Sequence, residues 1–275
     1  MYKIISHLCR WVHNILSRFW LHWNRILHKT LIIESEYGGL GDHLFLSHIP
    51  RIAKQSGLYK KVLFSTKSVI RDPSLRSLIW ESNPYLDGFI DKHGFVILPP
   101  HSSPSPRKKL FEVFYKFGLE NRITHIRPGC NLLDEIMIGY GLDDKKRFHD
   151  PEIYCDIPAI ECLEKSVVYD PNFATNVGFI SSLDVEQYFA SNNIYIDFQM
   201  AQRNNSIEIN QKTTVINSKS LLDFCSIIKS CKEIYCFTTG TATLASALKK
   251  PCNVLYGEGI NPNYHHSELH KYIKI

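Results

Sequence analysis

The fold class follows from residues 233–257, which read Glu-Ile-Tyr-Cys-Phe-Thr-Thr-Gly-Thr-Ala-Thr-Leu-Ala-Ser-Ala-Leu-Lys-Lys-Pro-Cys-Asn-Val-Leu-Tyr-Gly. The apolar runs Glu233–Phe237 and Asn253–Tyr256 predict two strands. The small residues of Gly240–Lys249 predict a helix between them. A strand, a tight turn, a helix and a second strand are typical of a βαβ unit with parallel strands.

The same alternation extends upstream of this stretch. Thr214–Ile216 predicts a strand and Ser220–Ser230 a helix, and Val167–Tyr169 begins this second α/β unit. The chain thus has the pattern of a doubly wound sheet in its C-terminal half.

The N-terminal half repeats the pattern. Thr30–Ser35, Lys61–Ser65 and Phe95–Leu98 predict strands, and helical patterns follow at 44–57, 72–80 and 132–140. We therefore predict an α/β protein with two Rossmann-like domains, 30–155 and 156–275, and a ligand cleft between them at the carboxyl ends of the strands.

The composition is that of an ordinary globular protein. The chain has 275 residues, 44% hydrophobic and 21% charged, and none of its eight cysteines forms a C-x-x-C pair. We expect free thiols in a reducing cytosol and no zinc site. Five of the 32 basic residues, and no acidic residue, lie in residues 1–33. The rest of the chain is neutral, which argues against nucleic acid as a partner.

Residues 1–29 form a distinct segment. Apolar residues from Ile4 to Leu27 recur at helical spacing, three tryptophans among them, and basic residues lie on the opposite face. The regularly spaced arginines exclude a membrane-spanning helix. We predict a basic amphipathic helix that docks on an anionic membrane surface through residues 1–28, or packs on the body of the protein or on a second subunit.

A glycine-rich turn follows the first strand and reads Glu36-Tyr-Gly-Gly-Leu-Gly-Asp-His43. Its glycines let the backbone turn sharply, and Asp42 stands where the next helix begins. Asp42 can serve as a helix cap, as a general base aimed into the cleft, or as both. The turn does not fit a dinucleotide fingerprint, because the third residue after Gly41 is Leu44.

A second turn joins Phe237 to the following helix and contains Thr238, Thr239, Gly240 and Thr241. Hydroxyls and free N–H groups at a helix N-terminus suit a pyrophosphate. The alternative is a threonine cap without a ligand.

Together, the two turns resemble those of glycosyltransferase family 9, the heptosyltransferase-like group. That family has a Gly-Asp turn followed by a helix with an early proline, which here are Gly41-Asp42 and Pro50. Its second signature is D-[ST]-G-x-x-H, a small-residue helix, K/R-P and a strand ending in Tyr/Phe-Gly. Here this is Thr238–Thr243, Lys250-Pro251 and Val254–Gly257, with Thr238 and Thr243 in place of the family's Asp and His.

The resemblance covers about residues 30–60 and 213–258 and implies a two-domain GT-B fold. It implies an inverting glycosyltransferase that moves a sugar from a nucleotide donor to a growing bacterial surface glycan, lipopolysaccharide or capsule, on the cytosolic face of the cytoplasmic membrane. Asp42 would be the base, and the Thr238–Thr243 turn would hold the diphosphate. No metal or other cofactor is required by this scheme, and the two departures leave the donor sugar open.

Several further residues are candidates for the site. Glu258 follows the last predicted strand and would contact the donor ribose or simply be exposed. Gly39, Gly41 and His43 flank Asp42 on the acceptor side. Arg107, in the basic Pro/Ser-rich loop 99–109, would meet an acidic acceptor or be a solvated charge. His265, His266 and His270 would line the cleft or belong to a solvated terminal segment; the alternative is a metal site, through the spacing of the last two.

Two other function classes remain. A Gly-Gly-Leu-Gly turn also occurs in fucosyltransferases, so a retaining or fucosyl-type GT-B transferase is the alternative enzyme. A non-catalytic, membrane-docked GT-B-like scaffold is the alternative from a different class. The partners expected of the enzyme are a nucleotide sugar and a glycolipid or polysaccharide acceptor.

Overall fold

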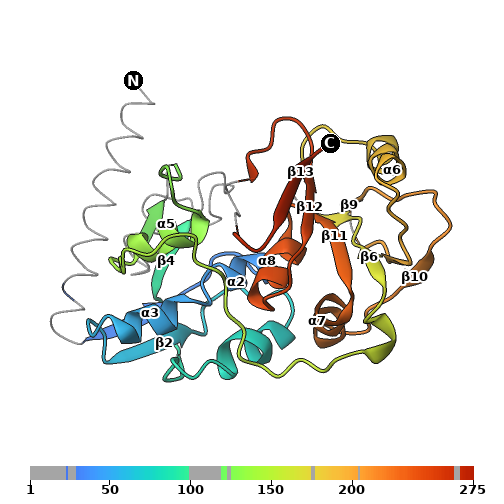
Figure 1. Ribbon diagram of the computed structural model, residues 1–275. Helices are drawn as coiled ribbons and strands as arrows, with labels where there is room; N and C mark the ends of the chain where they lie inside the picture. The colour runs from blue at the N-terminus through green and yellow to red at the C-terminus, as the bar shows by residue number, and fades with distance from the viewer. Residues whose placement is uncertain are drawn as a thin grey trace. The chain divides into compact units, whose positions relative to one another are not determined.

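The computed structural model describes Trp23 and residues 29–98, 119–122, 125–174, 177–203, 205–262 and 267–275. The chain divides into two compact units, Met1–His149 and Asp150–Ile275, and each has its own parallel sheet (Figure 1). The boundary lies a few residues before the predicted one at 155/156. The predicted amphipathic helix and Arg107 lie outside the described residues.

The sheet of the first unit has five parallel strands in the order β3-β2-β1-β4-β5. This is the strand order of a Rossmann-type sheet, in which the chain crosses over next to the first strand. Central strands read as apolar runs because both faces of the sheet are covered. The strands are β1 (Thr30–Ile33), β2 (Lys61–Ser65), β3 (Phe89–Ile90), β4 (Phe95–Leu98) and β5 (Leu119–Arg122).

The helix predicted after β1 is two helices in the structure. Helix α2 (Leu40–Leu44) ends before a turn, and α3 (Ile49–Gln55) starts again after it. Pro50 stands in the first turn of α3, where its missing N–H breaks no helical bond. In the interior of one longer helix the same proline would remove a hydrogen bond, so the interruption follows from its position.

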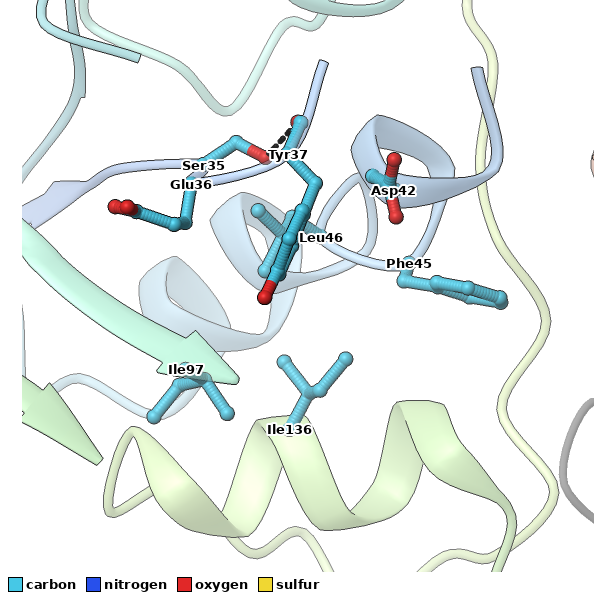
Figure 2. A pocket seen from close by; sticks show the side chains of 8 residues that line it. All are labelled: Ser35, Glu36, Tyr37, Asp42, Phe45, Leu46, Ile97 and Ile136. Carbon is cyan, nitrogen blue, oxygen red and sulfur yellow. Dashed lines mark hydrogen bonds between the residues drawn. The ribbon is translucent and has the colours of Figure 1, made fainter. Parts of the chain in front are cut away.

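The other helical patterns of the first unit also form. The segment predicted at 72–80 is the π-helical stretch η1 (Arg76–Glu81), which buries Trp80. Helix α5 (Leu132–Gly139) has a capping box in which Asn131 and Asp134 each accept the other's backbone N–H. Its buried residues are four apolar ones and the two acids Asp134 and Glu135. In Figure 2 this helix, which carries Ile136, lies below the strand that carries Ile97.

The sheet of the second unit has six parallel strands in the order β10-β8-β6-β11-β12-β13, again the Rossmann order. Figure 1 shows β11, β12 and β13 in orange and red. Four strands coincide with the predicted ranges, β6 (Val167–Tyr169), β10 (Thr214–Ile216), β11 (Glu233–Phe237) and β12 (Asn253–Tyr256). Patterns from sequence did not reveal β8 (Phe198–Met200), β13 (Lys271–Lys274) or the antiparallel pair β7 (Asn172–Phe173) and β9 (Asn205–Ser206).

Three α-helices occur in the described residues of the second unit. They are α6 (Ser182–Ser191), α7 (Leu221–Ser230) and α8 (Gly240–Ala247), and each has a hydroxyl side chain at its N-cap. A core cluster joins α6 to the sheet through Tyr169, Phe189 and Phe237. A single 3₁₀ turn, η2 (Glu161–Leu163), precedes β6. Among the residues that the structure describes, no helix has the length and apolar character needed to cross a membrane.

Candidate functional site

Asp42 lies in the first turn of α2, directly after the glycine turn. Gly39 is the N-cap in an extended conformation, and its N–H donates to Asp42 Oδ2 at 3.0 Å. Asp42 is therefore the third residue of the helix and not its N-cap as predicted, but its carboxylate does accept an N–H at the helix start. The glycines have a packing role, because a Cβ on Gly38 would lie 2.9 Å from the backbone nitrogen of Arg71 and one on Gly39 would lie 2.8 Å from Asp42 Oδ2. Gly41 accepts the N–H of Phe45 within the helix, at 3.0 Å.

The environment of Asp42 differs from that of an ordinary capping aspartate. Burial raises the pKa of Asp42, and the Gly39 N–H and the charge of Arg71 act in the opposite direction with smaller effect. Asp184 makes the equivalent cap in α6, accepting the N–H of Ser181 at 2.8 Å. That carboxylate is exposed, and hydrogen bonds from Ser181 lower its pKa. A raised pKa brings a carboxylate closer to the proton affinity that general base catalysis needs.

A small pocket adjoins Asp42. Its cavity volume is about 20 Å³, which is room for about one water molecule, and it is partly open to solvent. In Figure 2 the ring of Tyr37 points into the pocket, with Glu36 on one side and Asp42 on the other. The backbone before the glycine turn is held by Ser35, whose hydroxyl donates to the carbonyl of Tyr37 at 2.7 Å. The lining is acidic and polar on top and apolar below, with Ser35, Glu36, Tyr37, Asp42, Phe45, Leu46, Ile97 and Ile136.

His43 is not part of this pocket, contrary to the prediction from sequence. Its side chain is 0% exposed, and Trp80 Nε1 donates to His43 Nδ1 at 2.9 Å. The other nitrogen, Nε2, therefore carries the proton and donates to the carbonyl of Val69 at 2.9 Å. Neighbouring residues on a helix point about 100° apart, so the turn that directs Asp42 outward directs His43 into the core.

A buried histidine pair lies elsewhere in the first unit, and sequence reasoning did not find it. His149 donates from Nδ1 to Asp134 at 2.6 Å and from Nε2 to Asp144 at 3.2 Å. Burial alone would lower the pKa of His149, but the two carboxylates outweigh it and raise the pKa. His48 lies 5.7 Å away between ring centroids, and burial with the charge of His149 lowers its pKa to about 3. This arrangement is structural and ties α3 to the residues after α5.

The second turn has the shape predicted for it. Thr239 is the N-cap of α8, and its hydroxyl accepts the N–H of Thr241 at 3.3 Å. Thr238, Thr239, Thr241 and Thr243 are all at least nine-tenths buried. Within the described part of the chain, the N–H groups of Gly240 and Ala242 have no hydrogen-bond acceptor. They are the orphan donors that every helix N-terminus offers to an anion.

Fewer of the threonine hydroxyls can donate to a phosphate than the sequence suggested. Thr241 Oγ1 donates to Asp170 Oδ2 at 2.6 Å, and Thr243 Oγ1 donates to the carbonyl of Thr239 at 3.3 Å. Each hydroxyl has only one proton, so Thr241 and Thr243 cannot also donate to a phosphate. Thr239 Oγ1 donates to the carbonyl of Phe237 at 3.4 Å. Thr238 has no such internal bond among the described residues, so its hydroxyl and the two N–H groups remain as donors.

Asp170 is a residue of this site that sequence reasoning missed. It follows β6 directly, is 2% exposed, and accepts the side-chain N–H of Asn172 at 2.7 Å as well as the Thr241 hydroxyl. Asn172 in turn donates to the carbonyl of Ala201 at 3.0 Å. Strands β6 and β11 flank the crossover of the sheet, the place where ligands bind in such folds. An acidic residue directly after a predicted strand was the available signal.

The remaining predicted residues do not gather at one place: Glu258 follows β12 at the carboxyl edge of the sheet, whereas His270 precedes β13 at the amino edge. Glu258 follows β12 with its side chain exposed, and its carbonyl accepts the N–H of Phe179 at 3.0 Å. His270 is buried, with Nε2 2.8 Å from the carbonyl of Ala242 on α8. His265 and His266 are outside the described residues, as is Arg107. Across the residues that are described, no cluster of three or more potential metal ligands occurs.

Three solved structures with a similar fold are named as glycosyltransferases. The glycosyl transferase family 9 structure from Veillonella parvula matches with a TM-score of 0.55 at 12% identity, over 90% of this chain and 84% of that one. The E. coli ADP-heptose lps heptosyltransferase II matches with a TM-score of 0.58 at 12% identity, over 89% of each chain. The E. coli heptosyltransferase WaaC with ADP gives 0.55 at 12%, over 89% of this chain and 92% of that one.

No protein-family model matches the chain, and no curated protein is detectably similar to it in sequence. At 12% identity the structural likeness establishes the fold. The fold implied by the resemblance of the two turns is thereby confirmed, and the two Rossmann-type sheets follow one another along the chain as expected. This chain has the GT-B fold and is similar to the solved heptosyltransferase-like structures of glycosyltransferase family 9.

Proposed function

We propose that this protein is an inverting glycosyltransferase that moves a sugar from a nucleotide donor to a hydroxyl of a growing bacterial surface glycan, lipopolysaccharide or capsule. The fold of the similar structures supports transferase chemistry on a nucleotide sugar, since their names include ADP-heptose and ADP. The observation that carries the proposal is the position of Asp42, held by Gly39 at the edge of the pocket with a raised pKa.

In the proposed step an acceptor hydroxyl oxygen attacks the anomeric carbon of the donor sugar. The bond from that carbon to the diphosphate oxygen breaks, and the diphosphate leaves with the electron pair. Asp42 accepts the proton of the attacking hydroxyl, which is the task of a general base. Attack on the face opposite the leaving group inverts the anomeric configuration.

The second unit supplies the donor side in this proposal. The N–H groups of Gly240 and Ala242 and the hydroxyl of Thr238 would bind the diphosphate oxygens. The positive end of the α8 dipole would stabilise the charge that develops as the diphosphate leaves. The scheme assigns this role to fixed protein donors and therefore requires no metal ion.

The acceptor side of the proposal is the pocket lined by Tyr37 and Asp42. The hollow has room for about one water molecule, so in this proposal it receives the reacting hydroxyl group of the acceptor next to Asp42. The proposal also places the protein at the inner face of the cytoplasmic membrane, with the basic segment 1–28 on anionic lipid.

The decisive experiment compares Asp42→Asn with Asp184→Asn. Both variants lose a carboxylate that caps a helix, but only Asp42 adjoins the pocket. A screen of UDP, GDP, ADP and CMP sugars by thermal shift identifies the donor, and transfer is then measured with that donor. We expect Asp42→Asn to lower kcat by about 10²–10⁴-fold with unchanged donor affinity, and Asp184→Asn to keep full activity.

Other outcomes separate the alternatives. Transfer by Asp42→Asn at the wild-type rate, in a folded protein, would refute the base assignment. A product with retained anomeric configuration, read by NMR, would favour a retaining transferase. No binding and no transfer with any nucleotide sugar would favour a non-catalytic scaffold, for which the replacements at Thr238 and Thr243 are the motivation.

A further inference from the structure

An exposed aromatic ring stands beside the proposed donor site. The Phe179 side chain is 86% exposed, whereas Tyr169, Phe189 and Phe237 of the same unit are buried in its core. An exposed phenylalanine ring is not stabilised by contact with water, but single exposed apolar side chains are common on protein surfaces. What distinguishes Phe179 is how firmly the backbone holds it and where it stands.

The backbone around Phe179 is clamped onto the segment after β12. Phe179 N–H donates to the carbonyl of Glu258 at 3.0 Å, and Gly257 N–H donates to the carbonyl of Val177 at 2.9 Å, which forms an antiparallel bridge. Two glycines allow this approach. Gly178 has φ +96°, and a Cβ on it would lie 2.5 Å from the carbonyl of Gly257, while a Cβ on Gly257 would lie 2.5 Å from Phe179 O.

This clamp lies at the carboxyl edge of the sheet. Strands β11 and β12 are parallel neighbours, with Phe237 opposite Leu255, so the residues that follow them leave the same edge. Neighbouring strands lie about 4.8 Å apart. Thr238 and Gly240 follow β11, and Gly257 and Glu258 follow β12. The ring is therefore presented one strand away from the N-terminus of α8.

We propose that Phe179 is a stacking platform for the nucleobase of the donor. Glu258, expected from sequence to contact the donor ribose, is the residue to which Phe179 is bridged. This inference rests on the proposed function and adds the nucleoside subsite to it. The α8 N-terminus follows β11, and the bridged pair Phe179 and Glu258 lies at the end of the neighbouring strand β12, so the three groups share one edge of the sheet.

The chemistry around the ring favours a nucleoside over an apolar partner. The Glu258 side chain next to Phe179 is exposed, and a lipid or protein surface that covered the ring would have to desolvate that carboxylate. Ribose hydroxyls satisfy a carboxylate with hydrogen bonds, and every nucleobase has a flat face that stacks on an aromatic ring. Gly259, which has no side chain, leaves the space next to the ring open, with the Phe179 ring 3.9 Å from where its Cβ would stand.

The test measures binding of ADP, GDP, UDP and CDP, each alone, and of inorganic pyrophosphate, by calorimetry on the full chain. We expect Phe179→Ala to lower the affinity for the tightest-binding of the four nucleotides by about 5- to 150-fold, which is the range for base stacking on aromatic side chains. Pyrophosphate has no base, so its affinity should not change. Phe179→Trp should retain nucleotide affinity.

Tyr195→Ala is the matched control. Tyr195 is 75% exposed but precedes β8, at the opposite edge of the same parallel sheet, so its removal should leave nucleotide affinity unchanged. Glu258→Gln should reduce the preference for a ribonucleotide over its 2′-deoxy analogue.

The outcomes distinguish the two proposals. If Phe179→Ala binds a nucleotide as tightly as the wild type does, Phe179 is not a stacking platform, but the proposed function still stands. An equal loss of pyrophosphate and nucleotide affinity in Phe179→Ala also overturns it, since the change would then act through the phosphate site. Wild-type protein that binds none of the four nucleotides overturns both the platform and the proposed function.

Discussion

Asp170 and Thr241 are joined by a 2.6 Å hydrogen bond across 71 residues of sequence, from the end of β6 to the first turn of α8. The bond fixes the direction of the Thr241 hydroxyl and connects the two strands at the crossover of the sheet. The carboxylate is buried, and its other oxygen accepts from Asn172. The N-terminus of α8 is therefore positioned by a hydrogen bond within the protein itself.

We expect Thr241→Val to lower the free energy of unfolding by about 1–3 kcal/mol, because Asp170 Oδ2 is then left buried without its donor. Chemical denaturation measures this. Thr241→Ser keeps the hydroxyl and should stay close to wild type. A double-mutant cycle with Asp170→Ala should give a coupling energy of about 1.5–3 kcal/mol, as for hydrogen bonds to charged groups. A coupling near zero would mean that the bond does not contribute.

The pH dependence of transfer should report Asp42. The base works only when it is ionised, and burial raises its pKa above 3.8. As the pH falls through this raised pKa, kcat/KM should fall in proportion to the ionised fraction. The acid limb should therefore lie above the pH at which an ordinary exposed aspartate titrates. An acid limb that persists unchanged in the residual activity of Asp42→Asn would assign it to another group.

The stability of the first unit should depend on pH through His149. Its pKa is raised by Asp134 and Asp144, so the folded state holds this proton more tightly than the unfolded chain does. The contribution is fully present below the unfolded pKa of about 6.5 and is lost as the pH rises through the folded pKa. His149→Gln should therefore destabilise the protein by about 1.5–3 kcal/mol at pH 6 and by less at pH 9.

The buried neighbour of His149 makes the opposite contribution. The pKa of His48 is lowered to about 3, so the unfolded chain takes up this proton first as the pH falls below about 6.5. The free energy of unfolding should therefore fall as the pH is lowered from about 6.5 to about 3, both in the wild type and in His149→Gln. Melting temperatures across pH 4–9 would show both trends. Equal destabilisation by His149→Gln at pH 6 and pH 9 would contradict the assigned ion pair.

Removal of residues 1–28 should abolish binding to vesicles that contain anionic phospholipid. The segment carries basic residues without acidic ones and has apolar residues at helical spacing. Sedimentation with vesicles at two salt concentrations measures the effect, and zwitterionic vesicles are the control. Donor binding should persist in the truncated protein, because the proposed donor groups all lie beyond residue 169. Full vesicle binding after the deletion would place the membrane contact elsewhere.

The sequence by itself determined the local elements. Strands β2, β4, β6, β10, β11 and β12 coincide with the ranges read from apolar runs, because a short buried strand bounded by polar or glycine residues is a local pattern. The two turns were found in the same way, since a glycine or a capping side chain must stand at a fixed position in the chain. Short strands with polar residues, such as β9 and β13, have no such pattern and form because a partner strand offers hydrogen bonds.

Only the tertiary structure decided which side chains of those turns are available for chemistry. Sequence placed Asp42 and His43 together, but the packing of Phe64 and Trp80 takes the histidine into the core and leaves the aspartate at the pocket. It also brought Asp170 to Thr241 and clamped Phe179 onto Glu258, contacts between strand ends that are far apart in the chain. The physical reason is that a parallel sheet collects residues at one edge by crossover connections, so neighbours at the site are set by strand order and not by distance along the sequence.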